Sequence, residues 1–156
     1  MLLRGRRDAQ PGQGVSLNAF LDRFAPKIYV EVSPESFVFR KNEACFQLQT
    51  YVFVAAEGAG FRLVSAGEEP TAYGDALKIA LFDNHQRLPA GITKPELLEG
   101  FMRYAFKRLT TKTALLRPVV IYRGVNRLEH LFCGYQQALF RELAAAGGAV
   151  VVLFDG

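Results

Sequence analysis

The sequence contains few of the residues on which metal and thiol chemistry depends. Its 156 residues include two cysteines, two histidines and no tryptophan. Cys45 and Cys133 lie far apart, outside any CxxC or CxxH pattern, and His85 and His130 are too distant to form a local ligand pair. Isolated cysteines of this kind are typical of buried, reduced thiols. We therefore expect no metal site and no cysteine–histidine nucleophile.

Long apolar segments are also absent. No run approaches the roughly 20 residues that a membrane-spanning helix needs. The first residues, MLLRGRRDAQPGQGVSLNAF, lack the apolar stretch of a secretory signal. We expect a cytoplasmic protein, with a membrane-peripheral location as the alternative.

The excess of positive charge is small. The formal net charge is +4, and three arginines lie within the first seven residues. Arg117, Arg123 and Arg127 flank an expected strand, where they would offer a basic edge to an acidic partner or nucleic acid. Arginines beside strand ends usually contact only solvent. We expect no nucleic-acid partner.

The remaining composition is that of one globular domain, since half of the residues are hydrophobic. Residues 1–15 are polar and predict a flexible tail, and residues 16–156 predict a single lobe. The segment Ser16–Ala25 predicts a short amphipathic helix capped by Ser16. This helix would pack against the sheet of its own chain or, alternatively, lie on a membrane surface.

Hydrophobic periodicity predicts an α/β fold. Strands are expected at residues 27–32, 36–40, 44–56, 61–67, 117–123 and 149–156. Residues 75–82 predict one or two helical turns. A helix is expected from Thr93, which forms a capping box with Glu96, and a second from Asn126, which forms a box-like start with Glu129. Gly147 or Gly148 would end the second helix in a left-handed conformation.

Three stretches follow one another in the second half of the chain: GITKPELLEGFMRYAFKRL, LLRPVVIYRGVNRLEH and ALFRELAAAGGAVVVLFDG. In content and order they resemble the MreB family of bacterial rod-shape-determining proteins. LNAFLDRFAPKIYVEVSPESFVFR is similar to the family's opening helix and strand. The resemblance implies a ribonuclease-H-like, actin-like single lobe with a five-stranded mixed sheet in the order 3-2-1-4-5. Two long helices would lie on one face of this sheet.

The first phosphate-binding turn of the family is altered in this chain. MreB-type proteins use an Asp-x-Gly-Thr pattern, whose backbone N–H groups close on the phosphate. The resemblance places Glu31, Ser33 and Pro34 at its Asp, Gly and Thr positions, and Glu35 would add a negative charge. Pro34 has no N–H to donate. A second family segment, Asp-Gly-x-Ile-x-Asp, has Ala90 and Lys94 at its two Asp positions. The resemblance also places the second phosphate loop in segments that this chain does not include. We therefore expect no nucleotide cofactor, no catalytic residues and no enzymatic activity.

A two-metal nuclease of the same superfold would need converging carboxylates. Glu31, Asp83 and Asp155 are the candidates, but the expected fourth strand, PVVIYR, contributes none. We interpret the three as surface carboxylates.

The expected topology leaves one face of the sheet without a long helix. Right-handed crossovers that step in one direction place both helices on the same face. Val119–Tyr122 and Val150–Phe154 nevertheless have apolar residues on both sides, which is typical of strands buried on both faces. The other face would be covered by Ser16–Ala25 and Asp75–Phe82, by a second copy in a homodimer, or by another protein.

These observations lead to one functional hypothesis and two alternatives. The resemblance implies a non-catalytic, MreB-like protein that acts through protein–protein contacts in cell shape or cytoskeletal organisation. The first alternative is a degenerate nucleotide-binding or nuclease enzyme of the same superfold. The second is a half-protein that a separate chain completes.

Overall fold

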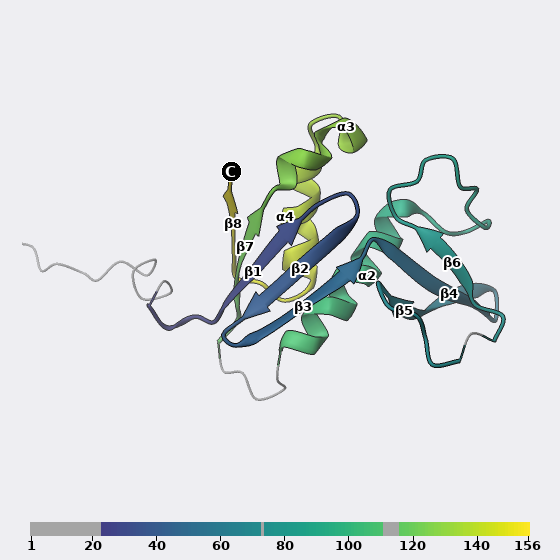
Figure 1. Cartoon of the computed structure of the whole chain (residues 1–156), viewed down its shortest axis with the longest axis horizontal. Helices are drawn as coiled ribbons and strands as arrows, with labels where there is room; N and C mark the ends of the chain where they lie inside the picture. Colours follow the sequence, from purple (N-terminus) through teal and green to yellow (C-terminus); the bar gives the residue numbers. More distant parts are fainter. Residues whose placement is uncertain (1–22, 73, 111–115) are drawn as a thin grey trace, which may run out of the picture.

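The computed structural model describes residues 23–72, 74–110 and 116–156. These residues form two β-sheets with helices packed against them (Figure 1). The expected tail and most of the expected Ser16–Ala25 helix lie outside the described residues, although Arg23 and Phe24 are helical. No helix of the described part is long and apolar enough to cross a membrane.

The larger sheet has five strands in the order β3-β2-β1-β7-β8. Its strands are β1 (Lys27–Val32), β2 (Ser36–Lys41), β3 (Ala44–Gln49), β7 (Val119–Arg123) and β8 (Val151–Asp155). The strands β1, β2 and β3 form an antiparallel meander, whereas β1, β7 and β8 run parallel. This mixed sheet confirms the expected strand order.

A second, smaller sheet was not predicted. It has the order β5-β4-β6 and consists of β4 (Tyr51–Glu57), β5 (Gly60–Ala66) and β6 (Leu77–Ala80). The prediction of helical turns at residues 75–82 is wrong, because Leu77–Ala80 pairs in antiparallel register with β4. Four residues carry too short a pattern to distinguish a strand from a helical turn.

The predicted strand at residues 44–56 is also wrong as a single element, because it divides at Thr50 between the two sheets. The backbone N–H of Thr50 donates to the carbonyl of Glu35, and its hydroxyl donates to the carbonyl of Pro34 at 2.6 Å. Its own carbonyl accepts from the N–H of Leu81. These contacts replace the ladder bonds at Thr50 and allow the chain to pass from one sheet to the other.

The first long helix confirms its predicted start. Helix α2 (Lys94–Leu109) begins after Thr93, whose side chain accepts from the N–H of Glu96 while the Glu96 carboxylate accepts from the N–H of Thr93. Its predicted apolar face is buried, together with Phe106.

The second predicted helix is interrupted. A short 3-10 helix η1 (Val125–Leu128) leads into α3 (Glu129–Phe132), and α4 (Gln136–Ala146) follows. The expected box at Asn126 is wrong, since η1 has no side-chain cap. Cys133 and Gly134 have φ values of 50° and 89°, which end α3. Gly148, at φ 95°, supplies the expected left-handed residue after α4.

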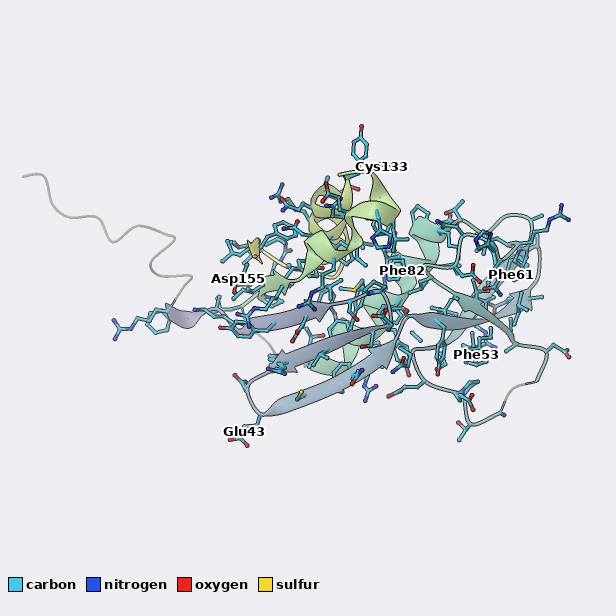
Figure 2. The ribbon with its side chains drawn as sticks, turned by 45° about the horizontal axis from the view of Figure 1, so that its top comes forward. Glu43, Phe53, Phe61, Phe82, Cys133 and Asp155 are labelled. Carbon is cyan, nitrogen blue, oxygen red and sulfur yellow. The ribbon has the colours of Figure 1, made fainter. Side chains whose placement is uncertain are left out.

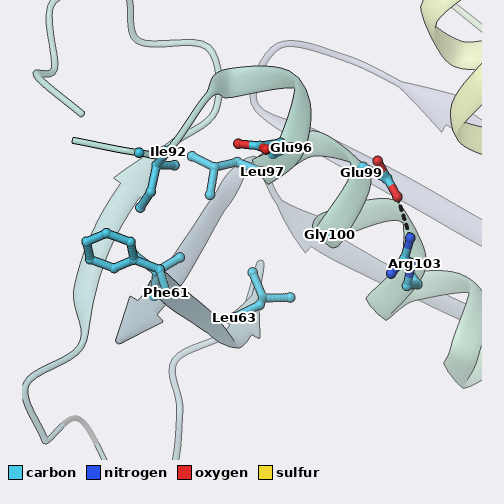
Figure 3. A pocket seen from close by; sticks show the side chains of 10 residues that line it. Phe61, Leu63, Ile92, Glu96, Leu97, Glu99, Gly100 and Arg103 are labelled. Atoms are coloured by element: carbon cyan, nitrogen blue, oxygen red, sulfur yellow. Dashed lines mark hydrogen bonds and ion pairs between the residues drawn. The ribbon is translucent and has the colours of Figure 1, made fainter. Parts of the chain in front are cut away.

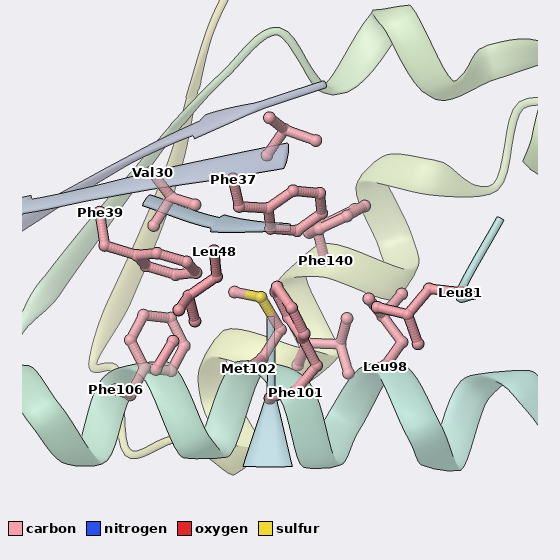
Figure 4. Close-up of a cluster of buried hydrophobic side chains, with 14 of the residues drawn as sticks. Val30, Phe37, Phe39, Leu48, Leu81, Leu98, Phe101, Met102, Phe106 and Phe140 are labelled. Atoms are coloured by element: carbon pink, nitrogen blue, oxygen red, sulfur yellow. The ribbon is translucent and has the colours of Figure 1, made fainter. Parts of the chain in front are cut away.

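The core lies between the large sheet and the helices α2 and α4 (Figure 4). The rings of Phe37 and Phe101 meet edge-to-face at 5.3 Å, and Phe37 also lies 5.8 Å from Phe140. Alternate residues of β1, namely Ile28, Val30 and Val32, point into this core. Both long helices therefore cover the same face of the sheet, as the topology predicted.

Candidate functional site

Two features of the large sheet are candidates for function: the edge formed by the carboxyl ends of β1, β7 and β8, and the face opposite α2 and α4. In open α/β sheets, ligands usually bind outside the carboxyl ends of the parallel strands. The turn that follows β1 lies at this edge. The face of the large sheet that points away from α2 and α4 is the open face.

The turn after β1 is closed by its own hydrogen bonds. The N–H of Ser33 donates to the carbonyl of Ser36 at 3.1 Å. The Ser33 hydroxyl donates to the same carbonyl at 2.9 Å and accepts from the N–H of Ser36 at 3.1 Å. Pro34 has no N–H. Among the described residues of this turn, only Glu35 keeps a backbone donor without a partner, whereas a phosphate cradle needs several converging N–H groups.

Charged side chains at the same edge are paired with one another. Arg123 donates to the Asp155 carboxylate at 2.7 Å, and Arg127 lies 3.7 Å from Glu31. The hydrogen bond and the charge of Asp155 raise the pKa of Arg123. Asp155 lies at the end of β8 (Figure 2).

The structure does not gather the candidate carboxylates. Asp83 lies beyond β6, where its side chain accepts from the N–H of His85 at 2.8 Å. Within the described ranges, no group of three or more His, Cys, Asp or Glu residues could hold a metal ion. Arg117 precedes β7 and is separated by the whole strand from Arg123 and Arg127, so the three arginines form no single basic edge.

Other candidate residues have structural surroundings. Lys94, at a family Asp position, donates to the backbone carbonyls of Ala80 and Asp83. Burial lowers its pKa, against an opposing effect of Asp83. The expectation that both cysteines are buried is wrong: Cys45 and Cys133 are exposed and unbonded. Cys45 lies on an edge strand, and Cys133 lies at the tip between α3 and α4 (Figure 2).

The open face consists of two rows of side chains that cross all five strands. Strand register places these residues opposite one another: Cys45, Arg40, Tyr29, Ile121 and Leu153 in the first row, and Gln47, Val38, Glu31, Arg123 and Asp155 in the second. Residues of one row are direct cross-strand neighbours. The first row has an apolar centre, and the second is mainly charged.

A shallow groove of about 280 Å³ runs between these rows. Tyr29, Val38 and Ile121 form its apolar part, and Arg40, Glu31 and Arg123 form its polar part. Tyr29 is 46% exposed and Leu153 is 45% exposed. The expectation of strands buried on both faces is therefore met only in part, since Val119 is buried but Ile121 is half-buried. Neither α2 nor α4 covers this face.

Sequence reasoning predicted the altered turn and the open face but not these rows. The alternation of Tyr29 and Glu31 with buried neighbours in β1 was the available signal. The residues of β2 and β7 that complete each row depend on strand register, which the one-dimensional pattern does not supply.

No protein-family model and no curated protein matches the sequence. The solved structures that match the fold include MreB5 of Spiroplasma citri bound to ADP and the same protein bound to AMPPNP. The first matches with a TM-score of 0.56 at 13% identity, and the second with 0.54 at 10% identity. Each match covers 85% of this chain and 38% of MreB5, so the chain corresponds to well under half of the solved protein. The chain has the actin-like fold of a single MreB-type lobe.

Proposed function

We propose that this protein is a non-catalytic, cytoplasmic, MreB-like protein that acts through protein–protein contact, with a second copy as the partner on its open face. One observation carries this proposal: Tyr29, Ile121 and Leu153 form a partly exposed apolar row on a sheet face that neither long helix covers. Exposed apolar rows of this kind are typical of interaction surfaces.

The arrangement of charge favours a self-complementary contact. The second row contains Glu31 and Asp155 together with Arg123. A two-fold axis that passes between Glu31 and Arg123 would bring Glu31 of one copy opposite Arg123 of the other. Five strands about 4.8 Å apart and about 18 Å long give a face on the order of 400 Å². This is about half of a standard interface per partner, so we expect a weak dimer.

A matched pair of substitutions tests the dimer. Leu153 and Leu77 are both 45% exposed, but Leu77 lies on β6 of the small sheet. Leu153→Asp is expected to abolish concentration-dependent dimerisation in analytical ultracentrifugation, and Leu77→Asp is expected to leave it unchanged. A wild-type chain that remains monomeric at millimolar concentration would refute the proposed partner.

The absence of catalysis is tested by calorimetric titration with magnesium ATP. The closed Ser33–Ser36 turn supports an outcome without measurable binding. Micromolar binding would contradict the proposal and would favour a degenerate nucleotide-binding enzyme.

A role in bacterial cell shape or cytoskeletal organisation is the cellular part of the proposal. It is supported by the likeness of the fold to MreB5. Deletion of the gene in its native host is expected to change cell width or curvature under the microscope, and normal dimensions across growth phases would refute this role.

A second candidate is a half-protein that a separate chain completes. It is supported by the fact that the match covers 38% of MreB5. A completing chain would contact the edge at Glu31, Arg123 and Arg127. Magnesium ATP binding that appears only when both chains are mixed would establish this candidate.

A further inference from the structure

A second groove, separate from the open face, lies between the small sheet and α2 (Figure 3). Its volume is about 350 Å³. Its apolar floor contains Phe61 and Leu63 of β5, Ile92 of the loop before α2, and Leu97 of α2. Phe61 is 41% exposed, although it is a large aromatic residue at the end of a paired strand. The groove therefore presents an apolar surface that the chain itself leaves partly in solvent.

Gly100 forms part of this groove and lies in the interior of α2. A glycine inside a helix is less favourable than alanine, because its backbone loses more conformational freedom on folding, so its presence needs a reason. A Cβ atom at Gly100 would meet only two methyl carbons of Leu63, both at 3.8 Å, which is ordinary van der Waals contact. Neither the backbone conformation nor the packing within the chain requires glycine here.

Two other glycines of the structure have an internal packing explanation. A Cβ atom at Gly67 would lie 2.4 Å from the Cβ of Leu48, and one at Gly147 would lie 2.5 Å from the ring of Phe106. Gly100 differs from these two glycines because it lines the open groove. Close approach of a ligand to the helix backbone is a known reason for glycine at such a position.

The rim of the groove carries more negative than positive charge. Glu96 uses one carboxylate oxygen, Oε2, to accept from Thr93, and Oε1 has no partner among the described residues. Glu99 is paired with Arg103. Two carboxylates against one guanidinium leave a net negative rim beside an apolar floor.

We propose that this groove binds a peptide segment of another protein, in which a large apolar side chain packs over Gly100 and a neighbouring lysine or arginine faces Glu96 and Glu99. The apolar floor favours the large apolar side chain of the peptide, and the negative charge of the rim favours its lysine or arginine. The missing Cβ at Gly100 allows the peptide to approach the helix closely.

Short synthetic peptides test this proposal on the full chain. The probe is the acetylated, amidated peptide Gly-Ser-Leu-Arg-Gly-Ser, with companions in which Leu is replaced by Phe or Ala and Arg by Gln or Glu. Binding is followed by amide chemical shifts in NMR spectra up to about 5 mM peptide, so that dissociation constants as weak as about 1 mM can be measured. We expect saturable shifts at Phe61, Leu63 and Gly100 with the Leu-Arg and Phe-Arg peptides. The Ala-Arg and Leu-Glu peptides should bind at least about fivefold more weakly.

Gly100→Ala separates binding from folding. The added methyl group raises helix propensity, so the melting temperature should stay equal or rise. The same methyl group occupies the contact point, so affinity for the Leu-Arg peptide should fall about tenfold. Gly60→Ala is the control, because a Cβ there would meet only the Glu57 carbonyl at 3.9 Å. Glu96→Gln should weaken binding about two- to fivefold.

Three outcomes would overturn the proposal. The first is the absence of saturable shifts with every peptide, and the second is equal binding by Gly100→Ala and wild type. The third is tighter binding by a peptide of residues 1–7, MLLRGRR, than by any probe, which would make a second copy the occupant. Loss of the dimer in ultracentrifugation bears only on the open face, and the two proposals can therefore fail separately.

Discussion

The hydroxyl of Tyr122 provides a sharp test of the packing in the core. Tyr122 is fully buried, and its hydroxyl has no hydrogen-bond partner among the described residues. Its ring lies 5.2 Å from Phe140 and 5.6 Å from Phe154, and both contacts survive in Tyr122→Phe. Burial of a polar group without a partner costs about 1–3 kcal/mol. We therefore expect Tyr122→Phe to raise the free energy of unfolding by about 1–2 kcal/mol.

The same substitution has a predictable effect on alkaline stability. Burial raises the pKa of Tyr122 in the folded chain well above its unfolded value. The folded state then holds a proton that the unfolded state releases above about pH 10. The contribution of this group is therefore fully present below that pH and is lost as the pH rises. The wild type should lose stability more steeply than Tyr122→Phe above about pH 10.

Urea unfolding, followed by far-ultraviolet circular dichroism near neutral pH and near pH 11, measures both effects. All other residues are identical in the two proteins, so the difference between their stabilities isolates Tyr122. Tyr135→Phe is the control and should change nothing, because Tyr135 is 75% exposed. A lower stability of Tyr122→Phe at an unchanged m-value would refute the reasoning, since it would mean that the hydroxyl is satisfied.

Four further substitutions, in three comparisons, test the fold by the same urea unfolding assay. Phe101→Ala should destabilise by about 3–5 kcal/mol, because it leaves a cavity in the centre of the core, and a loss below about 1 kcal/mol would contradict this packing. Thr93→Ala should cost about 0.5–2 kcal/mol by removing the cap of α2, and an unchanged midpoint would show that the cap contributes nothing. Gly67→Ala should cost more than Gly58→Ala. Both glycines have positive φ, at 65° and 58°, but only Gly67 would bring its Cβ against Leu48. Equal costs would show that the backbone conformation alone matters.

Much of the large sheet and α2 could be predicted because these elements carry their own local signals. Residues 27–32 alternate in polarity over a full strand, and Thr93 with Glu96 forms a capping box that depends on four consecutive residues. The turn at Ser33–Ser36 could be interpreted from sequence for the same reason, since proline removes an N–H wherever it stands.

Other elements could not be predicted, because their partners are distant in sequence. Residues 44–56 contain no turn signal, and the division at Thr50 arises from hydrogen bonds to Pro34, Glu35 and Leu81. Strand β6 has only four residues and exists because β4 offers it an edge. The break at Cys133 follows from a left-handed residue inside a pattern that otherwise continues as a helix.

By itself, the sequence determined the alternation of strands and helices and the loss of a backbone donor in the first turn, which are local properties of polarity, capping and proline. The order of the large sheet was an expectation drawn from the resemblance to MreB-type proteins. Tertiary structure alone decided which side chains share the two rows of the open face. It also decided that the groove beside Gly100 stays open. Strand register and the placement of β5 against α2 bring together residues that are far apart in the chain. Local sequence preferences do not specify such contacts.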